Sequence, residues 1–379
     1  MNLTNTAKWF KKFTFYLGGF VIFYYLLILV FIPSIKATIA IIIPDKNPPT
    51  IKYGVLPSLE FSTKAINGTP KFELNTANGK LPTELPTRAK VFKVKQMLFS
   101  YNAGKSAQDN AAYFGYSDSD LITDLKGKVY KWRSLQSGGT LEIDIDSKKL
   151  LMSSPLSGKS SIYKVGFHTD TSALKATTDM LTSIGRFDDL YVSGTNTINK
   201  GKYVNNKLIK TEDRADAQLY RIDFFRNIEK FKIVGPDPTK GLLHAYIGNE
   251  VNAPNNLKIT PSTFPIMELY YNEIDVNSEA TYPLLNISAA WNAVKQGKGI
   301  IANVTPKGNN PFVENETITV QDILINNISL AYYETPQSQK YLQPIYVFEG
   351  NYKTTGTQGG NIVIYFPAIA GEYIQAVSN

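Results

Sequence analysis

Residues 13–32 read FTFYLGGFVIFYYLLILVFI, twenty consecutive positions without a charged side chain. An α-helix rises about 1.5 Å per residue, so this segment would form a helix about 30 Å long, the thickness of the hydrocarbon core of a bilayer. A helix buried in a globular core normally keeps a polar face, and this segment has none. The segment from Phe13 to Ile32 therefore predicts a membrane-spanning helix, and the membrane is its expected partner.

The charges before this segment predict its orientation. Lys8, Lys11 and Lys12 precede it, and the first twelve residues contain no acidic side chain. Positive charge beside a spanning helix keeps that end in the cytoplasm. The apolar run is also longer than the roughly 7–15 residues of the hydrophobic part of a cleaved signal peptide. We therefore expect an uncleaved signal-anchor with one span, a cytoplasmic N-terminus and extracytoplasmic domains beyond the span.

The composition limits what the rest of the chain can be. Hydrophobic residues make up 43% of the chain and aromatic residues 12%, which favours packed cores over disorder. The net charge is +8, but lysines and arginines form no run long enough for a nucleic-acid patch. The chain has no cysteine, which excludes disulfides, thiolate metal sites and cysteine nucleophiles. A bacterial cell envelope is the location that this composition favours.

Three amphipathic helices are predicted beyond the anchor, and each is followed by a glycine and then by several strands. The helices are expected at 106–114, 172–184 and 287–296. An amphipathic helix on an antiparallel sheet is a stable two-layer arrangement. The predicted fold class is therefore α+β, an N-terminal transmembrane helix followed by tandem antiparallel-sheet-plus-helix units. The expected segments are a tail at 1–12, the span at 13–32, a juxtamembrane stalk at 33–50, and units at 51–165, 166–280 and 281–379.

Strands are predicted where apolar residues alternate or run together between turn residues. They are expected at 71–74, 90–98, 129–135, 140–146, 149–153, 219–228, 230–234, 243–248, 266–274, 299–304, 317–333, 342–352 and 361–367. The strand at 317–333 is expected to bend or split at Asn326-Asn327. The polar stretches 193–217 and 307–316 are expected to be solvated loops. Together with the strand edges, these loops are the surfaces predicted to recognise a partner.

Four short stretches near the C-terminus resemble a known family. They are SAAWNAV at 288–294 followed by Gly297, ISLAYYE at 328–334, LQPIYVFEG at 342–350 and YFPAI at 365–369. In this order they resemble the extracytoplasmic domains of the PepSY/YycI type, which occur in membrane-anchored regulators of sensor kinases and in YpeB-like spore-germination proteins. The resemblance lies mainly in residues 281–379. It implies a single N-terminal anchor, cystatin-like α+β units, and a role in binding or inhibiting another envelope protein.

No catalytic, cofactor-binding or metal-binding residue is predicted. The two histidines, His168 and His244, have no second histidine or cysteine at ligand spacing. The sequence SDSD at 117–120 is similar to part of a calcium loop, but it lacks the glycine and the distal glutamate of an EF-hand, so a capped turn is predicted.

Two further groups of side chains are given structural interpretations. Acidic residues that alternate with apolar ones predict a half-solvated strand; they are Glu142, Asp144 and Asp146. Aromatic residues in strands that are apolar on both faces predict core packing; they are Tyr332, Tyr333, Tyr346, Phe348, Tyr365 and Phe366.

The function predicted from the sequence is that of a non-enzymatic, single-pass extracytoplasmic protein. It would bind or regulate another envelope protein, such as a sensor kinase, a hydrolase or a secretion component. A structural subunit of a cell-surface assembly, associating with copies of itself, is the alternative, and an enzyme with an unrecognised site is the third hypothesis. Neither a cofactor nor a nucleic acid is expected as a partner.

Overall fold

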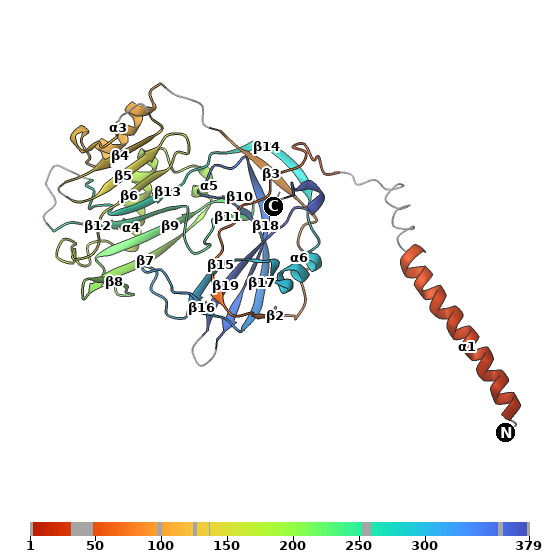
Figure 1. Ribbon diagram of the computed structural model, residues 1–379. Coiled ribbons are helices and arrows are strands. Elements are labelled where there is room, and N and C mark those ends of the chain that lie inside the picture. Colours follow the sequence, from red (N-terminus) through yellow and green to blue (C-terminus); the bar gives the residue numbers. More distant parts are fainter. Residues whose placement is uncertain are drawn as a thin grey trace. The chain divides into compact units, whose positions relative to one another are not determined.

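The computed structural model describes residues 3–31, 48–96, 101–123, 127–135, 137–251, 259–354 and 359–376. The chain divides into two compact units, Met1–Thr50 and Ile51–Asn379 (Figure 1).

The N-terminal unit is helical over most of its described part. Helix α1 (Leu3–Leu26) is followed directly by a π-helical turn, Leu27–Phe31. Apolar side chains along it are exposed, with Phe15 at 80% and Leu29 at 67%. Among the described residues, no helix is both long and apolar enough to cross a membrane. Ile32, the last residue of the predicted span, and most of the predicted stalk lie outside the described residues.

The C-terminal unit contains an 8-stranded sheet in which every pair of neighbouring strands is antiparallel. In spatial order its strands are β4 (Val129–Arg133), β5 (Thr140–Asp144), β6 (Leu150–Ser153), β13 (Ile266–Leu269), β12 (Leu243–Gly248), β9 (Leu219–Phe225), β7 (Thr195–Val204) and β8 (Lys207–Lys210).

The second large sheet has nine strands and is mixed. Its main path is β10 (Asn227–Ile228), β11 (Phe231–Val234), β17 (Asp322–Tyr333), β18 (Tyr341–Lys353), β19 (Gly360–Pro367) and β15 (Ile300–Pro306), and β2 (Lys71–Leu74), β3 (Arg88–Val94) and β14 (Ile274–Pro283) attach beside it. Strands β2 and β11 run parallel to β17. A separate parallel pair joins β1 (Ile66–Asn67) to β16 (Ile318–Thr319).

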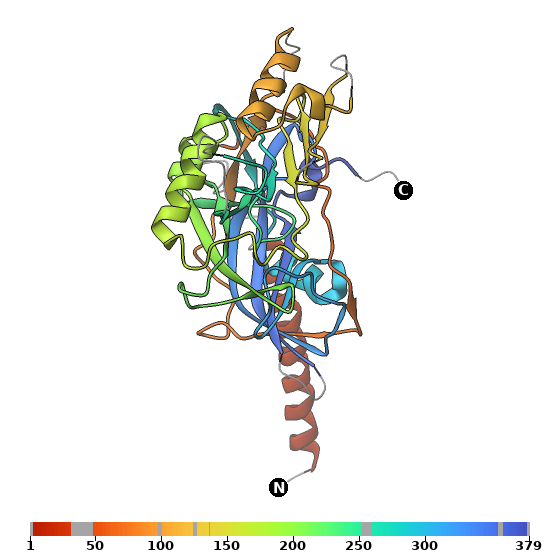
Figure 2. The ribbon, with the colours of Figure 1, turned by 90° about the vertical axis from the view of Figure 1, so that its left-hand side faces the viewer.

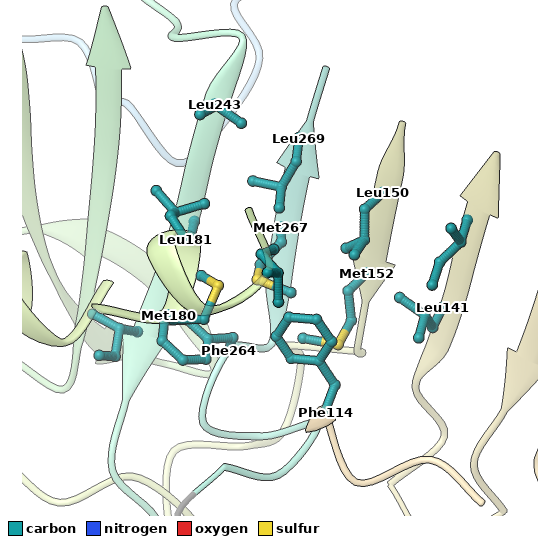
Figure 3. Close-up of a cluster of buried hydrophobic side chains, with 14 of the residues drawn as sticks. Phe114, Leu141, Leu150, Met152, Met180, Leu181, Leu243, Phe264, Met267 and Leu269 are labelled. Atoms are coloured by element: carbon teal, nitrogen blue, oxygen red, sulfur yellow. The ribbon is translucent and has the colours of Figure 1, made fainter. Parts of the chain in front are cut away.

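Two helices, α3 (Ala103–Tyr113) and α4 (Asp170–Ser183), cover one face of the 8-stranded sheet. Met180 and Leu181 of α4, and Phe114 after α3, pack with Met267 and Leu269 of β13 in the core of this face (Figure 3). The short helix α5 (Asp189–Val192) follows α4. In Figure 2 the layers follow one another as α4, the green strands of this sheet, the blue strands of the 9-stranded sheet, and the cyan helix α6.

Helix α6 (Ile287–Ala293) covers the outer face of the 9-stranded sheet. It begins at Asn286, whose Oδ1 accepts a hydrogen bond from the Ser288 N–H at 2.8 Å. A π-helical turn, Val294–Lys298, ends it, and Gly297 lies there at a φ of 77°, a conformation that favours glycine. Trp291 is 7% exposed, and its ring stacks on Phe348 with 6.0 Å between ring centres.

The structure confirms the α+β fold class, the three helices and most of the strands. It also confirms the bend in β17, because its pairing with β18 shifts register between Ile325 and Asn327. The aromatic residues predicted as core are buried, apart from Phe366, which is half-buried.

The strand pairing crosses the boundaries of the three expected units. β3, from the first expected unit, pairs with β14 and β18, and β6 pairs with β13 of the second. The two sheets therefore recruit strands from distant parts of the chain. The order of elements along the sequence does not determine which strand edges meet, and this is why the expected boundaries do not match the sheets.

The structure corrects the prediction of a loop at 193–217. This stretch is mainly a hairpin of β7 and β8. Its turn consists of Asn205 and Asn206, both at positive φ, 49° and 61°. This is the conformation of the tight turns that join antiparallel strands. The strands were missed because β7 is exposed at several successive positions and so has no apolar alternation. Strand β14 was likewise mostly not predicted.

Replacing Trp291 by alanine tests the packing of α6 on the sheet. Truncation of a buried tryptophan costs about 3–5 kcal/mol, because contacts are lost and a cavity remains. We expect Trp291→Ala to lower the free energy of unfolding of the C-terminal unit by this amount in urea denaturation of the full chain. Trp9→Ala, at a position that is 68% exposed, is the control and should leave that transition unchanged. Wild-type unfolding of Trp291→Ala would contradict the packing of α6.

Candidate functional site

Charged and polar side chains lie on the face of the 8-stranded sheet opposite α3 and α4. Side chains alternate between the two faces of a strand, so the residues between the apolar ones point away from the helices. We call this group the polar row; it consists of Arg221 and Asp223 on β9, His244 and Tyr246 on β12, and Glu268 on β13. His244 lies directly between Asp223 and Glu268 on the neighbouring strands. Arg221, Asp223, His244 and Tyr246 are all less than 9% exposed.

A buried ion pair forms one end of the polar row. Arg221 Nη2 donates to Asp223 Oδ1 at 2.8 Å, and the Gly241 N–H donates to the same oxygen at 3.0 Å. Burial raises the pKa of Asp223, and the charge of Arg221 opposes that rise. Arg221 Nη1 also donates to the carbonyl oxygen of Pro311 at 2.7 Å. Arg221 therefore neutralises a buried carboxylate and fixes the segment 307–316 to the sheet.

His244 forms the centre of the polar row. Its Nδ1 lies 2.9 Å from the carbonyl oxygen of Gly241; because a carbonyl only accepts, Nδ1 carries the hydrogen. Its Nε2 lies 3.8 Å from Glu268 Oε2, which also lies 3.0 Å from Lys240 Nζ. Burial, assisted by the charges of Lys240 and Arg221, lowers the pKa of His244 well below its usual value. His244 is therefore neutral at pH 7.

Two cavities border the polar row. The first, of about 430 Å³, is lined by His244, Tyr246 and Glu268 together with Asp237 and Asn303. The second, of about 940 Å³, is lined by residues of both large sheets, and we call it the inter-sheet cleft. Arg221 borders both cavities.

The walls of the inter-sheet cleft carry mainly small polar and apolar side chains. One wall belongs to the 8-stranded sheet and consists of Thr195, Thr197, Asn199, Arg221 and Phe225. The other wall belongs to the 9-stranded sheet and includes Asn327, Ser329, Ala331, Val347, Glu349 and Asn361. Hydroxyl and amide groups therefore face the cleft from both sheets.

The charges on the cleft are mostly positive. Its cationic residues are Lys210, Arg221, Lys230, Lys232 and Lys307, and its one acidic residue is Glu349. Lys210 pairs with Glu212 at 2.6 Å, and Glu349 Oε2 accepts from Asn327 Nδ2 at 2.8 Å. For Lys232 and Lys307, no carboxylate of the described residues lies within ion-pair distance. The cleft therefore has a cationic excess that the described part of the chain does not neutralise.

The histidines and acidic residues singled out in the sequence do not come together as one site. His168 lies before α4, with Nδ1 3.5 Å from Ser172 Oγ, and is not part of the polar row. Glu142 pairs with Lys131 at 3.0 Å and with Lys149 at 3.4 Å. In the part of the chain that the structure describes, no group of three or more His, Asp and Glu side chains could hold a metal ion.

Two local predictions are confirmed. Residues 117–120 form a capped turn, in which the Ser117 N–H donates to Asp120 Oδ2 at 2.8 Å. The half-solvated strand is β5, in which Glu142 and Asp144 are half-buried between buried residues. Asp146 lies outside this strand, in the turn after it, where its N–H donates to Asp144 Oδ1 at 2.9 Å.

The segment 307–316 is a loop, as predicted, and is exposed at 307, 308 and 313–316, but its middle packs against the sheet. Phe312 packs on Tyr246 with 5.8 Å between ring centres, and Asn310 Nδ2 donates to the carbonyl oxygen of Leu208 at 2.9 Å. With the Arg221 bond to Pro311, these contacts attach the segment to the 8-stranded sheet. It forms part of the cleft wall, so its deletion would remove structure and not only a recognition loop.

No protein-family model matches the chain, and no match is found among curated proteins. Among solved structures, the chain is similar to an uncharacterized protein from Eubacterium rectale ATCC 33656. The sequence identity is 14%, the match covers 80% of this chain and 88% of that chain, and the TM-score is 0.41. We draw nothing about function from a likeness of this degree.

The ion pair of the polar row predicts a strong response to removal of one partner. Arg221→Leu leaves Asp223 buried without a counter-charge, which typically costs about 3–5 kcal/mol. We expect the double variant Arg221→Leu, Asp223→Asn to recover part of this loss, because the asparagine oxygen still accepts from Gly241. The free energy of unfolding measured in urea checks both. A loss below about 0.5 kcal/mol in Arg221→Leu, the ordinary range for a surface substitution, would contradict the burial of the pair.

The lowered pKa of His244 predicts that stability depends on pH. The unfolded chain takes up a proton near the usual histidine pKa of about 6.5, whereas the folded chain does so only at lower pH. The neutral imidazole therefore contributes stability that is fully present above the unfolded pKa and is lost as the pH falls below about 6.5 toward the lower pKa of the folded chain. Burial also lowers the pKa of His168, so His168 contributes to this pH dependence with the same sign.

Two matched variants separate the contributions of the two histidines to the pH dependence of stability. His244→Asn keeps a donor for the Gly241 carbonyl and removes the titration, so we expect a flatter dependence of the unfolding free energy on pH. His168→Asn, at a less buried position, should change that dependence less. An equal or larger effect of His168→Asn would show that His244 is not the main source.

Proposed function

We propose that this chain is a non-enzymatic binding protein of the cell envelope. Its C-terminal unit, Ile51–Asn379, lies outside the membrane and binds an anionic region of another envelope protein in the inter-sheet cleft. The observation that carries this proposal is the charge of the cleft, whose volume is about 940 Å³. Arg221 and Lys210 are paired with Asp223 and Glu212, but Lys232 and Lys307 have no carboxylate of the described residues within ion-pair distance.

The charge and the shape of the cleft both favour an anionic ligand. A hollow lined by one sign of charge between walls of low dielectric concentrates the field and attracts the opposite charge. Lys232 and Lys307 offer donors without a carboxylate partner among the described residues. Thr197, Asn199 and Ser329 add hydroxyl and amide groups that fix orientation. An extended acidic segment of a protein fits this combination.

The N-terminal unit holds the protein at the membrane in this proposal. The uncharged sequence from Phe13 to Ile32 and the lysines before it support a single anchor with its N-terminus in the cytoplasm. The exposed apolar side chains of α1 agree with a lipid environment. The resemblance of residues 281–379 to PepSY/YycI-type domains supports regulation of the bound partner, such as a sensor kinase.

Copurification from native membranes tests the binding site. The full chain is crosslinked in cells, purified in detergent and analysed by mass spectrometry, as wild type and as Lys232→Glu, Lys307→Glu. Opposing like charges cost several kcal/mol, so we expect the double variant to recover at least about tenfold less partner. Lys207→Glu, an exposed lysine of β8 outside the cleft lining, is the matched control and should recover wild-type amounts.

Two outcomes of the same experiment would contradict the proposal. Equal recovery of the partner by wild type and double variant would place binding outside the cleft. Recovery of many copies of this chain alone would favour a structural subunit.

A further inference from the structure

The smaller of the two cavities, about 430 Å³ in volume, borders the polar row at His244, and we call it the His244 cavity. It differs from the inter-sheet cleft in the sign of its charge. Its charged residues are the carboxylates Asp237, Glu268, Glu314 and Glu316 and the cations Lys64, Arg221 and Lys240. Arg221 is paired with Asp223 and Lys240 with Glu268. The other three carboxylates have no ion-pair partner among the described residues, so the cavity has an anionic excess.

Two hydrogen-bond acceptors face each other in this cavity. Nδ1 of His244 donates to the Gly241 carbonyl oxygen at 2.9 Å, so Nε2 holds only a lone pair. Nε2 lies 3.8 Å from Glu268 Oε2, beyond hydrogen-bond distance, and no donor of the described residues lies closer to it. The side chain of His244 is nevertheless buried, at 1% exposure. A buried acceptor without a donor from its own chain requires a donor from a ligand or from water.

Asp237 adds a third acceptor. Its Oδ1 accepts from the N–H and the hydroxyl of Thr239, at 2.9 and 2.7 Å, and from Asn303 Nδ2 at 3.0 Å. Its Oδ2 accepts no hydrogen bond from the described residues. Within the described ranges, no three His, Asp and Glu side chains are arranged to hold one metal ion. A molecule that carries donors at several positions can reach acceptors that a single ion cannot.

Aromatic rings supply an apolar wall. Tyr246 and Phe312 both line the His244 cavity, with 5.8 Å between ring centres. The face of an aromatic ring is negative, so it attracts ammonium groups and the positive edges of other groups. Small-molecule sites typically combine such walls with a few placed polar groups in a volume of about 300–1,000 Å³. The His244 cavity has this combination and lies near the lower end of the range.

We infer that the His244 cavity binds a small hydroxylated amine of the size of an amino sugar. The ammonium group lies between His244 and Glu268, where a nitrogen about 2.9 Å from both Nε2 and Oε2 donates to both. The hydroxyl groups donate to Asp237, and the carbon skeleton packs on Tyr246 and Phe312. This site is separate from the inter-sheet cleft, and the inference does not rest on the proposed function.

The carboxylate of Glu268 has room for the ammonium group beside Lys240. Lys240 Nζ contacts Oε2, and Oε1 accepts no hydrogen bond from the described residues. The remaining carboxylates of the cavity offset the charge of Lys240. A neutral sugar would leave this anionic excess without a counter-charge, so the cavity favours an amine.

Three small probes test which groups of the ligand are recognised. The full chain in detergent is titrated at pH 7 with glucosamine, glucose and putrescine, and the affinities are measured by calorimetry. Glucose has a similar ring and hydroxyl groups without the amine, and putrescine has two ammonium groups without a hydroxyl. We expect glucosamine to bind at least about tenfold more tightly than either, because only glucosamine offers donors of both kinds.

Two matched substitutions locate the site. Glu268→Gln keeps the shape of the side chain and removes its charge, so we expect it to weaken glucosamine binding at least about tenfold. Glu142→Gln is the control and should bind as wild type. Glu142 is also a half-buried glutamate of the 8-stranded sheet with lysine partners, Lys131 and Lys149, and it is not part of the cavity wall.

The imidazole of His244 gives a readout that does not depend on affinity. The chain has only two histidines, so ¹⁵N-labelled histidine gives nuclear magnetic resonance signals from two rings, and His168→Asn identifies them. We expect the Nε2 signal of His244 to shift when glucosamine binds, because its lone pair gains a donor. The signals of His168, which is not part of the cavity wall, should stay in place.

Four results would overturn the inference. Equal affinity for glucosamine and glucose would show that the amine is not recognised, and tighter binding of putrescine would exclude a hydroxylated ligand. Unchanged binding by Glu268→Gln, or an unshifted Nε2 signal with glucosamine bound, would place the ligand elsewhere. Binding of none of the three probes would show that the cavity holds only water.

Discussion

A buried ion pair between Arg226 and Glu334 joins the two large sheets. Arg226 directly follows β9 and Glu334 directly follows β17, and both are at most 2% exposed. Arg226 Nη1 donates to the Asn272 carbonyl at 2.8 Å, and Asn272 Nδ2 donates to Glu334 Oε1 at 3.1 Å. Loss of Arg226 would leave Glu334 buried and unpaired, a cost of about 3–5 kcal/mol. Loss of Glu334 would leave Arg226 with Asp188 Oδ2, at 3.6 Å, as a remaining carboxylate partner. The pair therefore fixes the ends of β9 and β17, and other residues of both strands line the cleft.

The cleft exists because the sheet faces that meet there are not both apolar. The helix-covered face of the 8-stranded sheet closes into a core, whereas its opposite face carries Arg221, Asp223 and His244. Charged side chains are tolerated in this position only when they are paired or kept close to water. The polar row meets the first condition through its own ion pair and hydrogen bonds. The lysines at the edge of the inter-sheet cleft remain close to water, and they give the cleft its charge.

The sequence allowed the local structure to be predicted much better than the site. The amphipathic patterns of 172–184 and 287–296 located α4 and α6, because one apolar stripe is enough to identify a helix that covers a sheet. The hairpin of β7 and β8 has no such pattern, since it forms the edge of its sheet and is largely exposed. The cleft joins residues as distant as Thr195 and Asn361, and no local pattern encodes which strands meet. One signal was present: charged residues at alternate positions of the apolar strand LYRIDFF mark Arg221 and Asp223 as inward-facing.

The central claim is that the partner occupies the inter-sheet cleft, and site-specific photocrosslinking in living cells tests it most directly. A photoreactive amino acid replaces Thr197, an exposed residue of the cleft wall, or Thr182, an exposed residue of α4 on the opposite side of the same sheet. The account predicts a covalent adduct with a partner protein from position 197 and none from position 182. An adduct from position 182 with none from position 197 would contradict it.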